Sequence, residues 1–319
     1  MLERAAQQLN HPALIVLYLY TLSVVYVHFR GKVRLRFARQ FTEHSGILAP
    51  YNSLMYLFSA VPKDPILDSG DFPELQPLRD NWETIRDEAK QLWEGDRIRP
   101  SEKHNDLAFM AFYKRGWKRF YLKWYDDPMP SAEATCPKTV ELVQSIPSIK
   151  SAAFTLLPPG SILGKHRDPF AGSLRYHLGL ITPNSDACSI WVDGVQHSWR
   201  DGKDVVFDET YVHWAANNTD ATRIILFCDL TRPLHTPVAR GLNWLVTRFV
   251  IRATKSQNED GEKVGLLNRL TPAIYGARSK MQAFKGRSRK TYYGLKWAIL
   301  GGLAGSLVYV VLIRPLDLF

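Results

Sequence analysis

Five short segments rich in apolar residues, each ended by turn residues, occupy the middle of the chain and limit what it can fold into. They cover residues 151–157, 174–181, 188–194, 204–209 and 223–230, and pairs such as Pro-Gly, Pro-Asn and Asp-Gly separate them. Short strands at a spacing of about ten residues are typical of a β-sandwich or a small barrel. Because 45% of the 319 residues are apolar, the chain can bury a real core, which excludes a largely disordered protein.

The sequence before these segments favours helices. Apolar residues recur there at spacings of three and four, which predicts an amphipathic helix from about Pro73 to Gly95; this stripe is Leu75, Leu78, Trp82, Ile85, Ala89 and Leu92. A second helix is predicted near residues 138–145. We therefore expect five regions along the chain. They are an apolar and basic N-terminal segment (residues 1–40), a helical lead-in (41–150), a strand-rich core (151–235), a basic connector (236–296) and a C-terminal apolar segment (297–319).

Residues 12–29 and 297–313 are apolar runs without a formal charge. A helix needs about 17 to 20 apolar residues to cross a bilayer, so both runs are predicted to be membrane helices. A cleaved signal peptide is the alternative for the first run, although no small-residue cleavage site follows it. A buried core helix is the alternative for the second.

The basic residues gather beside these two runs. Residues 1–40 hold six Lys/Arg and one acid, and residues 278–296 hold seven Lys/Arg and no acid, within a total net charge of +10. The positive-inside rule places both zones and everything between them in the cytoplasm, and a count of only three cysteines fits a reducing compartment. The body between the zones carries a net charge of −2, which argues against a nucleic-acid partner.

One cluster in the strand region suggests a metal site. His166 and Asp168 are two residues apart, so on an extended chain they project to the same side, and His213 follows 47 residues after His166. Two histidines and one carboxylate form the facial triad of non-haem Fe(II) oxygenases, although zinc accepts the same ligands. The alternative reading is a turn in which Asp168 caps the backbone before Pro169.

Three further polar residues on predicted strands share the side expected to face the interior. Arg175 and His177 lie on one face of 174–181, and Arg223 opens the apolar segment 223–230. A buried arginine is costly unless it is paired, and its planar fork suits a carboxylate, so these residues favour a dicarboxylate cosubstrate. The alternatives are a surface salt bridge for Arg223 and a satisfied core histidine for His177.

The chain resembles a known family in these same segments. The run HRDPFAGSLRYHLGL, followed by WRDGKDVVFDETYVHW and TRIILFCDL, resembles the aspartyl/asparaginyl β-hydroxylase family of Fe(II)/2-oxoglutarate dioxygenases. Within that family the chain is similar to the bacterial membrane-bound lipid A acyl-chain 2-hydroxylases, as its N-terminal VYVHFRGKVRLRF also indicates. The resemblance covers roughly residues 20–250.

The resemblance implies a mainly β fold, a double-stranded β-helix or jelly roll, with helices packed outside it. It implies that His166, Asp168 and His213 bind Fe(II), that Arg223 holds the distal carboxylate of 2-oxoglutarate with help from the Thr155 hydroxyl, and that Arg175 and His177 contact the metal-proximal end. Animal members of the family lack the carboxylate ligand, so the presence of Asp168 weakens the carry-over of peptide substrates. The implied reaction uses O2 to hydroxylate C2 of a secondary acyl chain of lipid A, at the cytoplasmic face of the bacterial inner membrane.

The segment from Phe112 to Tyr125 adds a candidate lipid contact. Five cations lie there among seven aromatic residues; the cations are Lys114, Arg115, Lys118, Arg119 and Lys123. We expect the cations to meet lipid A phosphates and the rings to lie at the headgroup level. Stacking of single-stranded nucleic acid and a solvated cationic face over a core edge are the alternatives.

Two other functions stay open. A related dioxygenase could act on another membrane lipid or on a protein Asp/Asn side chain, and a non-catalytic jelly-roll module anchored to the membrane could share the fold. A hydrolase is disfavoured, because no G-x-S-x-G nucleophile motif occurs in the sequence.

Overall fold

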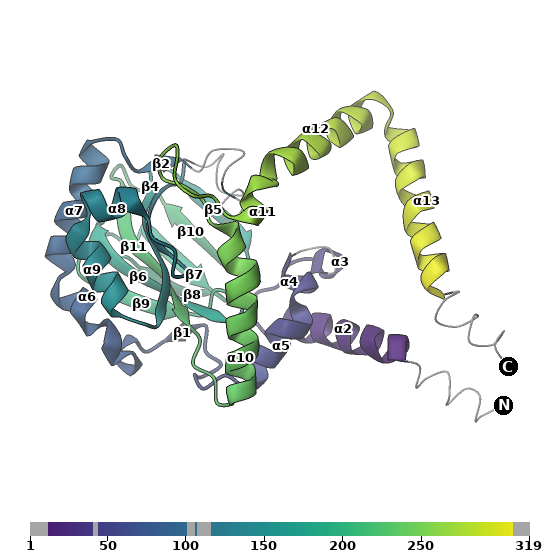
Figure 1. The fold of residues 1–319 in the computed structure, drawn as a ribbon, viewed down its shortest axis with the longest axis horizontal. Coiled ribbons are helices and arrows are strands. Elements are labelled where there is room, and N and C mark those ends of the chain that lie inside the picture. The colour runs from purple at the N-terminus through teal and green to yellow at the C-terminus, as the bar shows by residue number, and fades with distance from the viewer. Residues whose placement is uncertain (1–11, 41–43, 101–105, 107–115, 309–319) are drawn as a thin grey trace. The chain divides into compact units, whose positions relative to one another are not determined.

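The computed structural model describes residues 12–40, 44–100, 106 and 116–308 (Figure 1). The chain separates into two compact units, of which Tyr26–Thr271 holds both β-sheets. The other unit contains the helical residues before Tyr26 and after Thr271.

The larger sheet has seven antiparallel strands in the order β1-β9-β6-β11-β4-β3-β2. Their bounds are β1 Ile66–Leu67, β2 Arg99–Pro100, β3 Lys118–Trp124, β4 Ile149–Leu157, β6 Ser173–Ile181, β9 Asp204–Phe207 and β11 Arg223–Thr231. The smaller sheet has four antiparallel strands in the order β5-β10-β7-β8, which are β5 Ile162–His166, β7 Cys188–Val192, β8 Val195–Ser198 and β10 His213–Asn217.

From β4 onward the chain passes back and forth between the two sheets. β4, β6, β9 and β11 belong to the larger sheet, while β5, β7, β8 and β10 belong to the smaller one. This alternation is the winding of a jelly roll. The mainly β prediction is therefore confirmed, and all five strand segments proposed from the sequence are strands in the structure.

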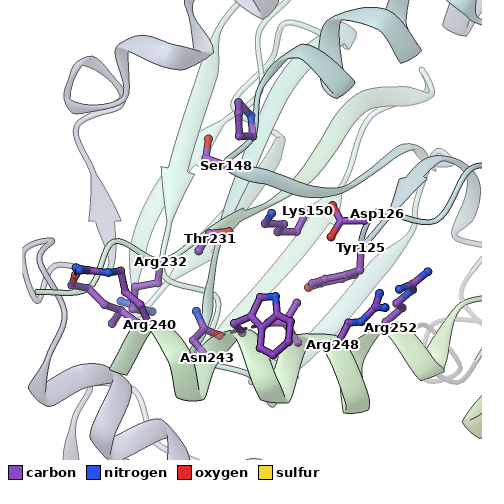
Figure 2. Close-up of a pocket in the computed structure, with 14 residues that line it drawn as sticks. Tyr125, Asp126, Ser148, Lys150, Thr231, Arg232, Arg240, Asn243, Arg248 and Arg252 are labelled. Atoms are coloured by element: carbon purple, nitrogen blue, oxygen red, sulfur yellow. Dashed lines mark hydrogen bonds between the residues drawn. The ribbon is translucent and has the colours of Figure 1, made fainter. Parts of the chain in front are cut away.

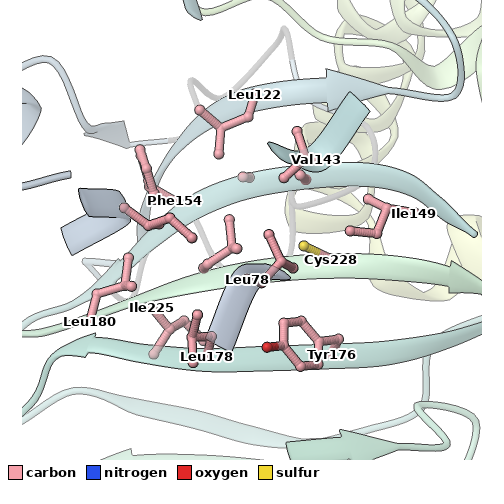
Figure 3. Close-up of a cluster of buried hydrophobic side chains, with 14 of the residues drawn as sticks. Leu78, Leu122, Val143, Ile149, Phe154, Tyr176, Leu178, Leu180, Ile225 and Cys228 are labelled. Carbon is pink, nitrogen blue, oxygen red and sulfur yellow. The ribbon is translucent and has the colours of Figure 1, made fainter. Parts of the chain in front are cut away.

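Helices cover one face of the larger sheet (Figure 1). They are α6 Gln76–Asp80, α7 Trp82–Glu94, α8 Pro130–Thr135 and α9 Pro137–Ser145. Leu78 and Val143 of these helices lie in one buried cluster with Phe154, Tyr176 and Cys228 of the sheet (Figure 3). Burial of this apolar face leaves the opposite face of the sheet free to bear polar side chains.

The predicted helix from Pro73 to Gly95 is present but divided. A 3-10 turn, Pro73–Leu75, leads into α6, and Asn81 separates α6 from α7, which ends at a cap on Gly95. The Asn81 side chain donates to the Pro77 carbonyl at 2.8 Å, which competes with continuation of the helix.

The remaining helices lie before and after the sheets. Before them come α2 Pro12–Phe29, α3 Phe37–Gln40, α4 His44–Ile47, α5 Ala49–Leu57 and the 3-10 turn Ser69–Asp71. After them come α10 Pro237–Val246, the π-helical continuation η4 Thr247–Ile251, the 3-10 turn η5 Arg252–Thr254, α11 Leu266–Arg269, α12 Thr271–Arg287 and α13 Arg289–Val308.

Within the described part of the chain, no helix is both long enough and apolar enough to cross a membrane. The two predicted membrane helices are thus not supported. Residues 12–29 do form α2, but Val27 and His28 near its C-terminal end are buried. α13 includes Arg289, Lys290 and Lys296, and residues 309–313 of the second run lie outside the described residues.

The cationic aromatic segment is a second correction. Phe112, Tyr113, Lys114 and Arg115 lie outside the described residues, and the rest of the segment enters the core as β3. Trp117, Phe120 and Tyr121 are at most 3% exposed, so these rings cannot lie in a headgroup layer. Arg119 is also buried, where its guanidinium pairs with Asp106 at 2.7 Å.

Candidate functional site

His166, Asp168 and His213 converge on one point between the two sheets. His166 ends β5 and His213 begins β10, and the two residues are direct partners in the antiparallel register. Asp168 follows β5 by two residues. Its carboxylate lies 3.7 Å from Nε2 of His166 and 4.0 Å from Nε2 of His213, and all three potential ligand atoms lie within 4.8 Å of one another. These distances suit a single bound cation.

Hydrogen bonds fix the orientation of both imidazole rings. Nδ1 of His166 donates to the Gly164 carbonyl at 2.7 Å, and Nδ1 of His213 donates to the Tyr211 carbonyl at 3.0 Å. Because a carbonyl can only accept, Nε2 of each ring is left as a lone-pair donor toward Asp168. Burial, reinforced by the neighbouring His213, lowers the pKa of His166 to about 4, and burial also lowers the pKa of His213. Both rings are therefore neutral at pH 7, as metal ligation requires.

Asp168 is held as an anion. Burial opposes ionisation, but attraction to His213 in its protonated form and to the permanent charge of Arg175 outweighs it and keeps the pKa of Asp168 below its usual range. Its second oxygen accepts from Arg175 at 2.8 Å, and its backbone N–H donates to the Glu209 carbonyl at 3.0 Å. The first oxygen is thus directed toward the histidines.

The loop that carries Asp168 is secured by hydrogen bonds to α5 and α2, two helices that precede it in the chain. Asn52 of α5 donates to the Pro169 carbonyl and accepts from the Ala171 N–H, each at 2.9 Å. Arg167, which belongs to the loop, donates from its guanidinium to the Val27 carbonyl of α2 at 2.6 Å. These bonds explain how a short loop between two sheets can hold one carboxylate in a defined position.

Arg175 lies behind Asp168 in a buried cluster of carboxylates. Besides Asp168, its guanidinium pairs with Glu209 and, at 3.0 Å, with Asp229. Although burial favours the neutral form, these three acids raise the pKa of Arg175. Burial, together with Asp229 and Asp168, raises the pKa of Glu209 well above its usual range. The charge of Arg175 is therefore paired within the protein itself.

Arg223, unlike Arg175, is buried without a neighbouring acid in the part of the chain that the structure describes. It is 2% exposed and has no acidic partner among the described residues, and its Nε makes no hydrogen bond there. Its guanidinium lies 4.4 Å from the centre of the Trp199 ring, and burial lowers its pKa to about 10. The alternative of a surface salt bridge is therefore wrong for Arg223.

Other unsatisfied polar atoms line the same cavity. Across the described structure, neither ring nitrogen of His177 nor the Thr155 hydroxyl has a hydrogen-bond partner. The cavity is lined by these two residues together with Arg175, Arg223 and the three converging residues, and its walls are otherwise mainly aromatic and aliphatic. A cavity with unsatisfied donors and a buried cation is suited to a ligand that is an anion with several acceptor atoms. A dicarboxylate is such a ligand.

The sequence did not identify several residues that shape this site. Asp229 had a signal, because it lies on the same face of β11 as Arg223 by the two-residue period of a strand. No sequence signal pointed to the other three residues, Glu209, Asn52 and Arg167. Each of them contacts residues more than 30 positions away or contacts the backbone.

Comparison with known proteins shows which chains this one is similar to. Residues 79–233 match the model of the family Aspartyl/Asparaginyl beta-hydroxylase. The chain is 34% identical over 208 residues to the ornithine lipid ester-linked acyl 2-hydroxylase of Rhizobium tropici, covering 64% of this chain and 73% of that protein. It is 30% identical over 126 residues to the aspartate beta-hydroxylase domain-containing protein 2 of Homo sapiens, covering 37% of this chain and 34% of that one.

Among solved structures, a Pseudomonas putida prolyl-4-hydroxylase matches with a TM-score of 0.34 and 18% identity, over 48% of this chain and 87% of that one. The family match and the extent of the Rhizobium match establish the relationship without it. The chain belongs to the aspartyl/asparaginyl β-hydroxylase family and is a hydroxylase.

Proposed function

We propose that this chain is an Fe(II)- and 2-oxoglutarate-dependent dioxygenase that hydroxylates an acyl chain of a membrane lipid. The observation that carries the proposal is the convergence of His166, Asp168 and His213 beside the unpaired Arg223. Two histidines and one carboxylate leave coordination positions open for a cosubstrate, which is typical of non-haem iron oxygenases. When bound, ferrous iron with 2-oxoglutarate and O2 supplies the oxidising power for inserting one oxygen atom into a C–H bond, with succinate and CO2 as co-products.

Each residue of the site has a defined part in this proposal. His166 and His213 bind the metal through Nε2, and Asp168 binds it through the oxygen that faces them. Arg223 holds the distal carboxylate of 2-oxoglutarate with a hydrogen bond from Thr155, and both groups are unsatisfied without it. His177 contacts the metal-proximal end. Arg175, which is also proposed to contact that end, orients Asp168 through its hydrogen bond.

The proposed substrate is a fatty acyl chain hydroxylated at C2. The Rhizobium relative is by its name an ornithine lipid ester-linked acyl 2-hydroxylase, which supports the same position on an ester-linked chain here. We propose a secondary acyl chain of lipid A as the substrate, at the cytoplasmic face of the bacterial inner membrane, as the resemblance of the N-terminal region implies. Ornithine lipid is the second candidate, because it is the lipid named for that relative.

Lipid mass spectrometry tests the proposal. Extracts from bacterial cells with and without the protein are compared for lipid A and ornithine lipid whose mass is greater by one oxygen atom. We expect that species with the native chain and its loss with His213→Ala, whereas Asp220→Ala, a surface change away from the site, should keep it. Hydroxylation by His213→Ala at the native level would refute the ligand assignment. Oxygen gain in peptides but not in lipids would favour protein Asp/Asn hydroxylation, which the human relatives exemplify by name.

A further inference from the structure

A second cavity, of about 380 Å³, lies apart from the proposed catalytic one and shares no lining residue with it. Figure 2 shows α10 and its continuation along one side of this cavity, and the strand residues Lys150 and Thr231 opposite. Thr231, which lines this cavity, ends β11, whereas Arg223 of the proposed catalytic cavity begins the same strand, about 25 Å away at the usual rise per strand residue.

The lining of this cavity is strongly cationic. It contains five basic residues and one acidic residue, Asp126; the basic residues are Lys150, Arg232, Arg240, Arg248 and Arg252. A cavity lined by one sign of charge raises the local concentration of ions of the opposite sign. The cavity therefore attracts anions.

Two of these five cations are neutralised by the protein and do not count toward a ligand. Arg232 pairs with Asp208 at 2.8 Å, and Arg252 pairs with Asp127 through two hydrogen bonds. Arg240 donates to backbone carbonyls but has no acidic partner in the described structure.

Lys150 and Arg248 have neither a carboxylate nor a hydrogen-bond partner for their side chains among the described residues. They come from opposite walls, Lys150 from β4 and Arg248 from η4 (Figure 2). Cations placed on two sides of one cavity can both reach an anion that has several oxygens. A phosphate offers such oxygens, and charge-assisted hydrogen bonds to it are strong.

A neutral donor without a partner, Thr231, lines the same cavity. The Thr231 hydroxyl is buried and makes no hydrogen bond within the described chain. A buried hydroxyl that lacks a partner destabilises the protein, and a ligand oxygen would remove that cost. Thr231 thus points to a ligand independently of the charges.

The backbone at the edge of the cavity is held in an uncommon conformation. Tyr125 and Asp126 both have positive φ, 42° and 67°, which non-glycine residues seldom adopt. The Tyr125 hydroxyl donates to Asp229 at 3.0 Å and so holds this turn in place. The turn closes the cavity at the end opposite Arg240 (Figure 2).

Apolar side chains adjoin the cations on the same helix. Trp244 lines the cavity and is 59% exposed, and its ring contacts Phe249, which is 68% exposed, in an edge-to-face arrangement. A phosphate ion alone would not fill about 380 Å³. The ligand therefore has an organic portion that Trp244 can contact.

We propose that this cavity is a binding site for a phosphate-bearing organic molecule, with the phosphate between Lys150, Arg248 and Thr231 and the organic portion against Trp244. The site does not depend on the proposed catalytic residues. Either a phosphorylated lipid headgroup or a soluble phosphate ester has this chemistry, and the experiment below separates the two.

Calorimetric titration tests the proposal with the full chain purified in a neutral, phosphate-free detergent at low salt. The probes are inorganic phosphate, glycerol 3-phosphate and short-chain phosphatidic acid. The double variant Lys150→Ser/Arg248→Ser removes the two unpaired cations. The control Arg86→Ser/Lys90→Ser removes the same charges from the exposed face of α7.

We expect the native chain and the control to bind at least one phosphate ester, and the cavity variant to bind it at least ten-fold more weakly. Trp244→Ala should weaken binding of the esters but not of inorganic phosphate. Tighter binding of phosphatidic acid than of glycerol 3-phosphate identifies a lipid headgroup as the source, and the reverse order identifies a soluble ester. Equal affinities for the two double variants, or no saturable binding of any probe, would overturn the proposal. Hydroxylation assays on the same samples are read separately, so failure of this site and failure of the proposed function give different results.

Discussion

Arg175 and Arg223 are buried on adjacent strands of the larger sheet, and the protein treats their charges in opposite ways. Arg175 of β6 is surrounded by three carboxylates from its own chain, whereas Arg223 of β11 has no acidic partner among the described residues. A buried ion that is fully paired contributes to structure, while an unpaired one is costly unless a ligand completes it. The difference indicates that Arg175 stabilises the fold at one end of the cavity, whereas Arg223 at the other end is placed to bind an anion.

The largest effect is expected at Arg175. Arg175→Met leaves Asp168, Glu209 and Asp229 buried without their shared cation, so the free energy of unfolding should fall by about 3 to 5 kcal/mol. Urea denaturation at neutral pH measures this change. A loss below about 1 kcal/mol, the scale of a single ordinary hydrogen bond, would show that the three acids do not rely on Arg175.

Arg223→Met is the matched change at the unpaired arginine. Because it removes a buried charge that has no counter-charge, we expect no loss of stability without cosubstrate, in contrast to Arg175→Met. The apparent affinity for 2-oxoglutarate should fall by about 30-fold or more, since truncating one partner of a buried charge pair costs about 2 to 5 kcal/mol. The KM for 2-oxoglutarate and its protection against thermal unfolding are the measurements. Native affinity in Arg223→Met would place the distal carboxylate elsewhere.

His166, in the same cavity, makes the stability of the protein depend on pH. Burial, with a contribution from His213, lowers the pKa of His166 from 6.5 to about 4, so the unfolded chain takes up a proton in this interval and the folded chain does not. Stability of the metal-free protein should therefore fall as the pH decreases from about 6.5 toward 4, and the loss should be smaller in His166→Gln. Urea titrations at several pH values measure the slope. An identical slope in native protein and His166→Gln would contradict the assignment.

The smallest expected effect is at Tyr125, whose hydroxyl contacts Asp229, one of the three acids around Arg175. Tyr125→Phe removes the hydrogen bond to Asp229 and should destabilise the protein by about 1 kcal/mol. Asp229 also accepts from Ser151 at 2.6 Å, so it keeps a partner. Urea denaturation should show a loss well below that of Arg175→Met. A loss equal to it would mean that Tyr125, rather than the arginine, holds the cluster together.

The sequence predicted those parts of the site that depend on local geometry. Two-residue spacing was enough to place His166 beside Asp168 and Arg175 beside His177. Two partners of Arg175 could not be assigned to it from the sequence, because Glu209 and Asp229 reach it only through the pairing of β6 with β9 and β11. Sequence spacing carries no information about which strands become neighbours.

The errors in the fold have similar causes. β5 and β10 were missed because each has only five residues, among which Gly, Lys, His and Asn interrupt the apolar pattern. β3 was interpreted as part of a lipid-facing segment because its cations lie among aromatic residues, whereas in the fold Asp106 neutralises Arg119. A charge that is paired through tertiary structure looks exposed when the sequence is considered alone.

The direct pairing of His166 with His213 has a mechanical consequence. These residues sit on the two adjoining strands at the end of the smaller sheet, where a register irregularity follows His213. A cation bound by both rings would cross-link β5 and β10 at the point where the backbone hydrogen bonds between these strands are interrupted. Withdrawal of that cation should then loosen this edge of the smaller sheet first, while the helix-covered sheet keeps its order.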